Sequence, residues 1–320
     1  MAFITDKNKA RDLIYGAAEK GACTALFCTG SFWNTEAILR GALDFADKHG
    51  LATVPVVVAM TSNYSHMAQA RRITRCGDDR IGIKGVMDYC RLLCDGPGAP
   101  YGRVDVMPHL DHGDPKADLW ALTEGRSYFA SVMFDAQTYP YEENVAITRD
   151  YVKAWGDTVL VEGIFEGLSV GDGQKARQED DYVEKALRFV KETGVDFLVA
   201  DLGTEQQSAG REAKYLKDRA CRLTAALGKP MLVLHGVSSL RDEQIRTICG
   251  DGIIRANMWT RIVREAGQYA AKRLTERVDR LAANDFEACE ATAYINDNID
   301  KAAEIMEGIM GQLGYALLAN

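Results

Sequence analysis

The chain has 320 residues, of which 47% are hydrophobic and 26% charged, and its formal net charge is −8. This composition is typical of a globular protein with enough apolar material for a sizeable core. The negative charge argues against a nucleic-acid binder, which needs a basic surface to neutralise phosphates. No apolar run approaches the ~20 residues of a membrane-spanning helix, and the N-terminus lacks a signal-peptide pattern. We therefore expect a cytoplasmic protein without a membrane partner.

Eight cysteines are scattered along the chain. They lack the paired spacing of a zinc-binding motif, and a chain of this length does not depend on disulfides for stability. We therefore expect reduced thiols, in agreement with a cytoplasmic location.

Short apolar segments alternate with longer amphipathic segments along nearly the whole chain. The predicted strands are Thr24–Cys28, Val54–Met60, Val104–Leu110, Tyr128–Phe134, Thr158–Glu162, Phe197–Leu202, Met231–His235 and Ile253–Met258. The predicted helices include Thr35–Lys48, Glu142–Trp155, Asp180–Thr193 and Arg211–Leu227. Short apolar strands are typical of parallel sheets that are buried on both faces.

Eight strand–helix units predict an α/β fold, a (β/α)8 TIM barrel that forms a single domain over residues 1–320. Extra C-terminal helices are expected from about residue 281. A doubly wound open sheet is the alternative, but no Gly-x-Gly-x-x-Gly motif follows the first predicted strand.

Polar side chains follow several of the predicted strands. In such a barrel the loops after the strands meet at one mouth, where functional residues lie. The polar residues at these positions are Asp111, His112, Asp135, Glu162, Gln206, Gln207, His235, Asn257 and Thr260. Three of the five histidines, at positions 109, 112 and 235, fall at or beside strand ends. This grouping predicts a site for proton transfer or metal binding.

Five segments resemble the class II (metal-dependent) fructose-bisphosphate and tagatose-bisphosphate aldolase family. They are Asn34–Glu36, His109–Gly113, Ser131–Asn144, Pro230–Ser239 and Arg255–Thr260, in the order that the family has. The second resembles the family's metal and base motif, and the fourth resembles its Pro-Leu-Val-Leu-His-Gly-x-Ser-Gly. The chain is therefore identified as a divergent member of this family.

The resemblance implies a lyase that cleaves or forms a carbon–carbon bond in a ketose or ketose phosphate through a metal-stabilised enediolate. His112 and His235 would be ligands of a divalent metal, expected to be zinc. Asp111 would transfer the proton at the hydroxyl next to the breaking bond, and Asn257 would hold the enediolate. The further substrate-binding residues would be Asn34, Gln207, Gly236, Ser238 and Thr260. A homodimer or homotetramer is implied as well.

Two ligand positions differ from the family. Ile164 stands where the family has its second strand-five glutamate, so Glu162 is the expected ligand and Glu166 the other candidate at an even offset. Gln206 replaces a third histidine and is the remaining expected ligand, although an amide oxygen suits harder metals better than zinc. The alternative for Gln206 is a direct hydrogen bond to a substrate hydroxyl. Asp135 either supports a ligand histidine or caps a helix.

Gln207 and Ser239 replace glycines whose backbone approaches the substrate phosphate in the family. Side chains there obstruct a nest of backbone N–H groups. We therefore expect a singly phosphorylated or otherwise acidic sugar rather than fructose 1,6-bisphosphate, with Arg241 and Arg255 as candidate partners for its charge. The family's mobile loop after strand five is shortened to residues 168–178, and the acidic run 179–181 is expected to begin the next helix.

Three alternatives to the lyase remain open. An epimerase or isomerase would use the same enediolate without releasing a three-carbon product. A non-catalytic sugar-binding homologue would lack the metal. A Schiff-base (class I) mechanism needs a lysine in the barrel mouth, and no predicted strand carries one near its C-terminal end.

Overall fold

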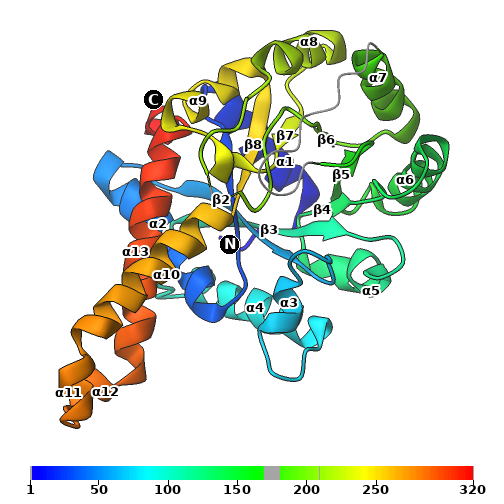
Figure 1. Ribbon diagram of the computed structural model, residues 1–320. Coiled ribbons are helices and arrows are strands. Elements are labelled where there is room, and N and C mark those ends of the chain that lie inside the picture. Colours follow the sequence, from blue (N-terminus) through cyan, green and yellow to red (C-terminus); the bar gives the residue numbers. More distant parts are fainter. Residues whose placement is uncertain (1, 169–180, 209, 320) are drawn as a thin grey trace.

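The computed structural model of the protein describes residues 2–168, 181–208 and 210–319. Its parallel strands close into a barrel in sequence order, with the last strand pairing with the first (Figure 1). The strands are β1 (Thr24–Cys28), β2 (Val54–Thr61), β3 (Val104–Gly113), β4 (Ser131–Phe134), β5 (Leu160–Ile164), β6 (Phe197–Val199), β7 (Leu232–Leu234) and β8 (Ile253–Met258). This closed parallel order confirms the predicted (β/α)8 TIM barrel.

Helices surround the barrel and extend beyond it. They are α1 (Lys7–Glu19), α2 (Phe32–His49), α3 (Gln69–Arg72), α4 (Asp79–Cys94), α5 (Leu119–Leu122), α6 (Tyr141–Trp155), α7 (Tyr182–Thr193), α8 (Lys217–Leu227), α9 (Asp242–Ile245), α10 (Thr260–Glu276), α11 (Val278–Ala282), α12 (Phe286–Cys289) and α13 (Ala291–Gln312). Because they cover the outer face of strands whose inner face is filled by side chains, the strands are buried on both faces, as their apolar sequences predict.

The first helix closes the end of the barrel opposite to the predicted site. Ala10 and Ile14 of α1 belong to the apolar cluster that fills the barrel interior. The Arg11 guanidinium lies 2.6 Å from Asp196, which directly precedes β6. Figure 1 shows α1 behind the strands. The mouth formed by the carboxyl ends of the strands therefore remains the only end that α1 does not cover.

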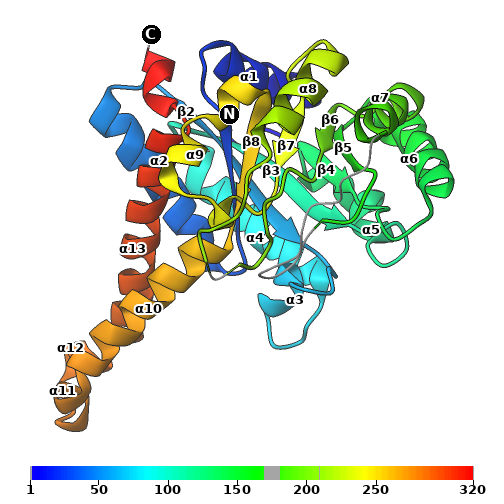
Figure 2. The same cartoon turned by 45° about the horizontal axis from the view of Figure 1, so that its top comes forward.

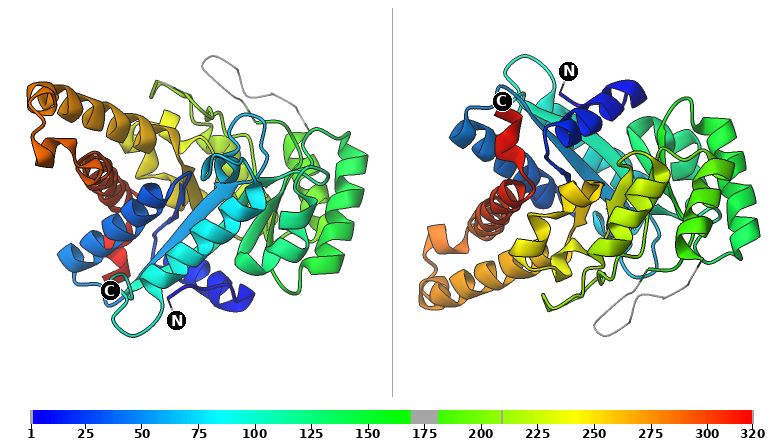
Figure 3. Two further views of the ribbon diagram at one scale, coloured as in Figure 1. Left: turned by 90° about the horizontal axis from the view of Figure 1, so that it is seen from below. Right: turned by 90° about the horizontal axis from the view of Figure 1, so that it is seen from above.

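The C-terminal helices form an arm. Helices α10 and α13 run side by side away from the barrel, with α11 and α12 at the tip (Figures 2 and 3). Helix α13 packs on α2, where Ala302, Met306 and Ile309 are buried. Exposed apolar side chains, Val278 and Phe286 among them, lie near the tip. Within the described ranges, no helix combines the length and apolarity needed to cross a bilayer.

The prediction of a helix from Arg211 is wrong for residues 211–216, because α8 begins at Lys217. Backbone groups of this segment bond to neighbouring loops: the Ala213 N–H donates to the Ser239 carbonyl, and the Leu216 N–H to the Leu202 carbonyl. These bonds replace the helical ones, so the segment follows the rim of the barrel.

Strands five and six also differ from their predicted limits. Strand β5 runs from Leu160 to Ile164 and not from residue 158 to 162, so Glu162 lies in the middle of a strand and not at its end. Strand β6 stops at Val199, because the Asp201 N–H donates to the carboxylate of Glu166 at 3.1 Å. The predicted loop 168–178 and acidic run 179–181 lie almost entirely outside the described residues.

Candidate active site

Asp111 and His112 reach the mouth of the barrel from consecutive positions of β3. In a regular strand, neighbouring side chains point to opposite faces. Here the pairing of β3 with β4 shifts register between Leu110 and Gly113, and His112 has a φ of 50°, in the left-handed region. This bulge turns both side chains into the same pocket.

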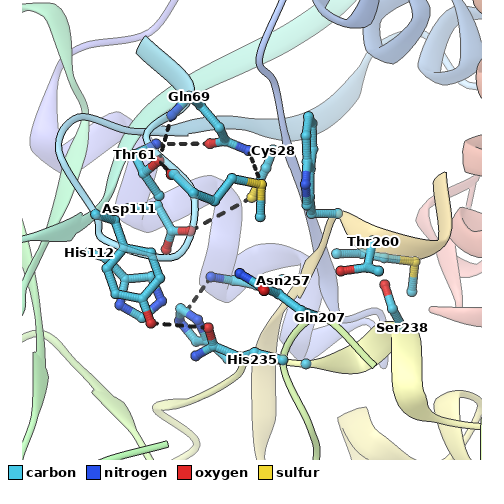
Figure 4. A pocket seen from close by; sticks show the side chains of 16 residues that line it. Cys28, Thr61, Gln69, Asp111, His112, Gln207, His235, Ser238, Asn257 and Thr260 are labelled. Atoms are coloured by element: carbon cyan, nitrogen blue, oxygen red, sulfur yellow. Dashed lines mark hydrogen bonds between the residues drawn. The ribbon is translucent and has the colours of Figure 1, made fainter. Parts of the chain in front are cut away.

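The pocket lies at the carboxyl ends of the strands, and residues of β1, β2, β3 and β8 converge on it with residues that follow β6 and β7 (Figure 4). It is lined by Cys28, Thr61, Tyr64, Met67, Gln69, Asp111, His112, Gln206, Gln207, His235, Gly236, Ser238, Asn257, Met258, Trp259 and Thr260. One ligand atom each from Asp111, His112 and His235 lies within 4.8 Å of the others. The structure therefore brings His235 beside Asp111 and His112, although Asp111 and His235 are 124 positions apart in the sequence.

His112 is oriented by a buried carboxylate. Its Nδ1 donates to Asp135 Oδ2 at 2.7 Å, and the Gln137 amide donates to the same oxygen at 2.7 Å. Helix α6 begins only at Tyr141, so Asp135 supports the histidine and is not a helix cap. Burial alone lowers the pKa of His112, but the carboxylates of Asp111 and Asp135 outweigh it and raise the pKa overall. This arrangement leaves Nε2 of His112 for a ligand.

His235 is held on the opposite side of the cluster. Its Nε2 lies 3.2 Å from Glu162 Oε1 and 2.9 Å from the Asn257 amide nitrogen. Burial lowers the pKa of His235 to about 4, so its imidazole is neutral at neutral pH. A neutral imidazole is the form that binds a metal.

Asp111 completes the cluster. Its Oδ2 accepts from the Cys28 thiol at 3.7 Å, while its Oδ1 is buried and has no hydrogen-bond partner among the described residues. A buried carboxylate oxygen without a partner indicates a missing cation or proton donor. Imidazole and carboxylate groups this close together are donor types that bind zinc, so the residues present fit a divalent metal.

The family model for class II fructose-bisphosphate aldolase matches residues 8–316. The chain belongs to this family. The resemblance found in the sequence is therefore confirmed, and so is the class of enzyme, since these aldolases are metal-dependent aldehyde-lyases.

Several curated relatives are aldolases. A 6-phospho-5-dehydro-2-deoxy-D-gluconate aldolase of Shouchella clausii is 38% identical over 217 residues, which cover 66% of this chain and 71% of the relative. A fructose-bisphosphate aldolase of Streptococcus pneumoniae is 32% identical over 291 residues, 88% of this chain and 85% of the relative.

Solved structures support the fold. The fructose-bisphosphate aldolase of Campylobacter jejuni has a TM-score of 0.75 at 15% identity and covers 97% of this chain and 95% of its own. The YdjI aldolase of Escherichia coli K12 has a TM-score of 0.65 at 21% identity, with coverages of 95% and 96%.

This family member differs from the expected ligand set at Glu162. The Glu162 carboxylate is fully buried, forms an ion pair with Arg255 and does not line the pocket. Its mid-strand position explains this burial. Arg255 is equally buried, so the prediction that it contacts an acidic group of the substrate is wrong. Glu166 does not line the pocket, and its carboxylate accepts from the Tyr182 hydroxyl.

Gln206 lines the pocket, but its amide oxygen is already engaged. The hydroxyl of Tyr64 donates to Gln206 Oε1 at 3.3 Å, and the Tyr64 ring stacks on His112 with a centroid distance of 4.1 Å and an angle of 6°. The Gln206 amide nitrogen is buried and has no partner in the described part of the chain. Gln206 is thus fixed beside the cluster with a free donor.

The predicted substrate-binding loop residues are placed as follows. Gly236 has a φ of +67°, and a Cβ there would lie 2.8 Å from the backbone of Glu205, so only glycine fits. Gln207, which replaces a glycine of the family, has a left-handed backbone with a φ of 57°. The Ser239 hydroxyl donates to the Gly236 carbonyl at 2.7 Å, and Ser239 does not line the pocket. Its side chain therefore does not obstruct an anion there, contrary to our prediction. Ser238 and Thr260 line the pocket together, opposite Asp111 in Figure 4.

Two predicted residues lie elsewhere. Asn34 is buried in the first turn of α2 and does not line the pocket. Arg241 is exposed and lies 3.9 Å from Glu212. The pocket has no lysine among its described lining residues, which offers no support for a Schiff-base mechanism.

The sequence analysis missed Cys28 and Tyr64, which line the pocket from the ends of β1 and β2. Both obey the rule that functional residues follow barrel strands. Their place at or just after the ends of the first two strands is the sequence signal that points to them.

Proposed function

We propose that this chain catalyses the metal-dependent aldol cleavage or formation of an acidic ketose phosphate. The observation that carries the proposal is the cluster of Asp111, His112 and His235 in the pocket at the barrel mouth. His112 and His235 would hold the metal, and zinc suits their neutral imidazoles. The metal would hold the ketose oxygens and stabilise the enediolate that forms when the carbon–carbon bond breaks.

The remaining residues of the cluster would have separate tasks. Asp111 would take the proton from the substrate hydroxyl, because it lines the pocket and its Oδ1 has no hydrogen-bond partner among the described residues. Asn257 would donate to an oxygen of the enediolate. Glu162, neutralised by Arg255, would accept from His235 and so hold that imidazole in place.

Gln206 would bind the substrate rather than the metal. Its amide oxygen accepts from Tyr64, whereas its buried amide nitrogen has no partner in the described ranges. A buried donor without a partner gains most when a ligand oxygen satisfies it. The substrate would therefore carry a hydroxyl or carbonyl oxygen at this side of the pocket.

An acidic, singly phosphorylated sugar is the proposed substrate class. The Shouchella clausii relative is named for a phosphorylated gluconate derivative, which has one phosphate and one carboxylate. Gln207, in place of a family glycine, lines the pocket and narrows the approach to the backbone N–H groups there.

We further propose a cytoplasmic homodimer or homotetramer. A chain of this length does not depend on disulfides for stability, which supports a reducing compartment. The arm presents Val278 and Phe286 to solvent, and Phe286 is 79% exposed. Apolar side chains so exposed on a projecting element are typical of an interface between subunits.

The test is the metal content of the purified protein, of His112→Ala and of His235→Ala. We expect one equivalent of metal in the wild type and its loss in both variants. His49→Ala, on the exposed end of α2, is the matched control and should keep the metal. A panel of ketose phosphates is then screened for a three-carbon product. No bound metal in the wild type, even after addition of zinc, manganese or cobalt, would contradict the proposal and favour a non-catalytic sugar-binding protein.

A further inference from the structure

A second cavity lies next to the pocket and is lined by three arginines. Arg211 comes from the loop before α8, whereas Arg261 and Arg264 come from the first turns of α10. Ser238 lines both this cavity and the pocket. The two spaces therefore share Ser238 as part of their walls, on the side of the pocket away from Asp111 (Figure 4).

The cavity has more positive than negative charge. Asp242 accepts from Arg211 and, at 3.2 Å, from Arg261, and Glu265 accepts from Arg261 at 3.1 Å. Arg264 has no ion pair among the described residues, and its guanidinium reaches only the Ser208 carbonyl, at 3.5 Å. Three cations and two carboxylates leave one charge uncompensated.

The acidic residues hold the arginines in place. Asp242 fixes Arg211 and Arg261 from the same side, and the Arg211 Nε–H donates to the Leu240 carbonyl at 3.1 Å. A guanidinium that is already oriented loses little conformational freedom when it binds an anion. Arg264 supplies the free charge beside this fixed pair.

Ser238 connects the two spaces chemically. Its Oγ accepts from the Arg261 backbone N–H at 3.1 Å, so the hydroxyl proton remains available to a ligand. The side chain is buried, with 6% of its surface exposed. A ligand in the pocket that accepts this proton lies against the residue that the two spaces share.

We propose that the cavity of Arg211, Arg261 and Arg264 binds the anionic group at the end of the substrate chain remote from the reacting carbons. This inference rests on the proposed function and names a structural requirement of its substrate. Guanidinium groups bind phosphate and carboxylate through side-chain N–H groups, so they do not need the open backbone that Gln207 narrows. The substrate is thus long enough to extend from the metal-binding cluster past Ser238.

The first experiment measures the binding of inorganic phosphate by calorimetry to the wild type, Arg264→Gln and Arg222→Gln. Arg222 is an exposed arginine of α8 that lines neither space. Arg222→Gln removes the same charge as Arg264→Gln and serves as its control. We expect phosphate to bind about tenfold more weakly to Arg264→Gln only, since one charged hydrogen bond is lost. Equal affinity in all three proteins would overturn the proposal.

The second experiment compares the ketose phosphate found in the screen with its unphosphorylated counterpart. Arg264→Gln should raise KM for the phosphorylated sugar about tenfold, leave its kcat unchanged, and leave both constants for the neutral sugar unchanged. Weaker phosphate binding with an unchanged KM would mean that the cavity binds a free anion, and would overturn the assignment to the substrate. If no sugar is cleaved, the proposed function fails, while the phosphate measurement still tests the cavity.

Discussion

The β3 and β7 side of the barrel mouth differs from the β5 and β6 side in the contacts that its polar side chains make. His112 and His235 belong to the first side and to the cluster that could hold a metal. Nδ1 of His112 contacts the Asp135 carboxylate, and Nε2 of His235 contacts the Glu162 carboxylate. On the other side the polar side chains are engaged elsewhere: Glu162, in the middle of β5, pairs with Arg255, and Gln206, after β6, accepts from Tyr64. The same barrel mouth thus has a side adapted to a metal and a side adapted to other contacts.

This difference shows that the ion-pair and hydrogen-bond partners of a side chain decide whether it can bind a metal, as much as its position in the barrel does. Glu162 lies only 3.2 Å from His235, yet a buried arginine neutralises it. A carboxylate paired in this way orients a ligand, whereas Asp111, with an oxygen that lacks a partner in the described ranges, is free to react.

The largest effect is expected at Asp111. Asp111→Asn should lower kcat by about 10²–10⁴-fold, the usual contribution of a proton-transfer group, while the protein keeps its metal. Steady-state assays and metal analysis of the same preparation test this. Asp105→Asn, near the other end of β3, is the control. Loss of metal in Asp111→Asn would show instead that Asp111 is a ligand.

The buried pair on β5 and β8 should dominate stability. Arg255→Met leaves Glu162 buried without its partner, so the free energy of unfolding should fall by about 3–5 kcal/mol. Urea denaturation measures this fall. The double variant Glu162→Met with Arg255→Met should lose less than Arg255→Met alone, because it leaves no buried charge. An Arg255→Met protein as stable as the wild type would refute the ion pair of Glu162 with Arg255.

Glu166, just beyond β5, should make stability depend on pH. Burial raises the pKa of Glu166 from its ordinary 4.5 to about 7, so the folded protein favours the protonated carboxyl. The unfolded chain releases this proton near pH 4.5 and the folded one only near pH 7. The free energy of unfolding of the wild type, relative to that of Glu166→Gln, should therefore fall by about 3 kcal/mol as the pH rises from 4.5 to about 7. The slope is about 1.4 kcal/mol per pH unit.

Parallel urea titrations of the wild type and Glu166→Gln between pH 4 and pH 8 measure this difference. The other titrating groups act on both proteins and cancel in the comparison. A difference that stays constant with pH, or that grows in favour of the wild type above pH 7, would contradict the expected protonation of Glu166.

The smallest effect is expected from restoring an imidazole on the β6 side. Gln206→His should strengthen zinc binding about tenfold, since a third imidazole beside the cluster is a better ligand than an amide. It should also raise KM, because the substrate loses the amide donor. Competition with a chelator gives the zinc affinity, and Gln207→His, one residue further on, should leave it unchanged. An unaltered affinity in Gln206→His would place residue 206 out of reach of the metal.

The sequence was sufficient for the barrel and for the grouping of Asp111, His112 and His235 at its mouth, while the roles of these residues stay predictions. Apolar strands of the right length and spacing predict the fold, and Asp111, His112 and His235 follow directly from their place after such strands. Glu162 was misjudged because β5 begins two residues later than predicted. The contact between Gln206 and Tyr64 joins residues 142 positions apart, and no local pattern reveals it. The arginine cavity likewise depends on how the loop before α8 meets helix α10.

The left-handed backbone of His112 has a consequence for protein engineering. A histidine in this conformation is held there by its neighbours at a cost of about 1–3 kcal/mol. A designer who copies only the pair of side chains onto a regular strand of another barrel would send one of them to the outer face. Transplanting this chemistry therefore means transplanting the kink, together with the Asp135 carboxylate that fixes the ring.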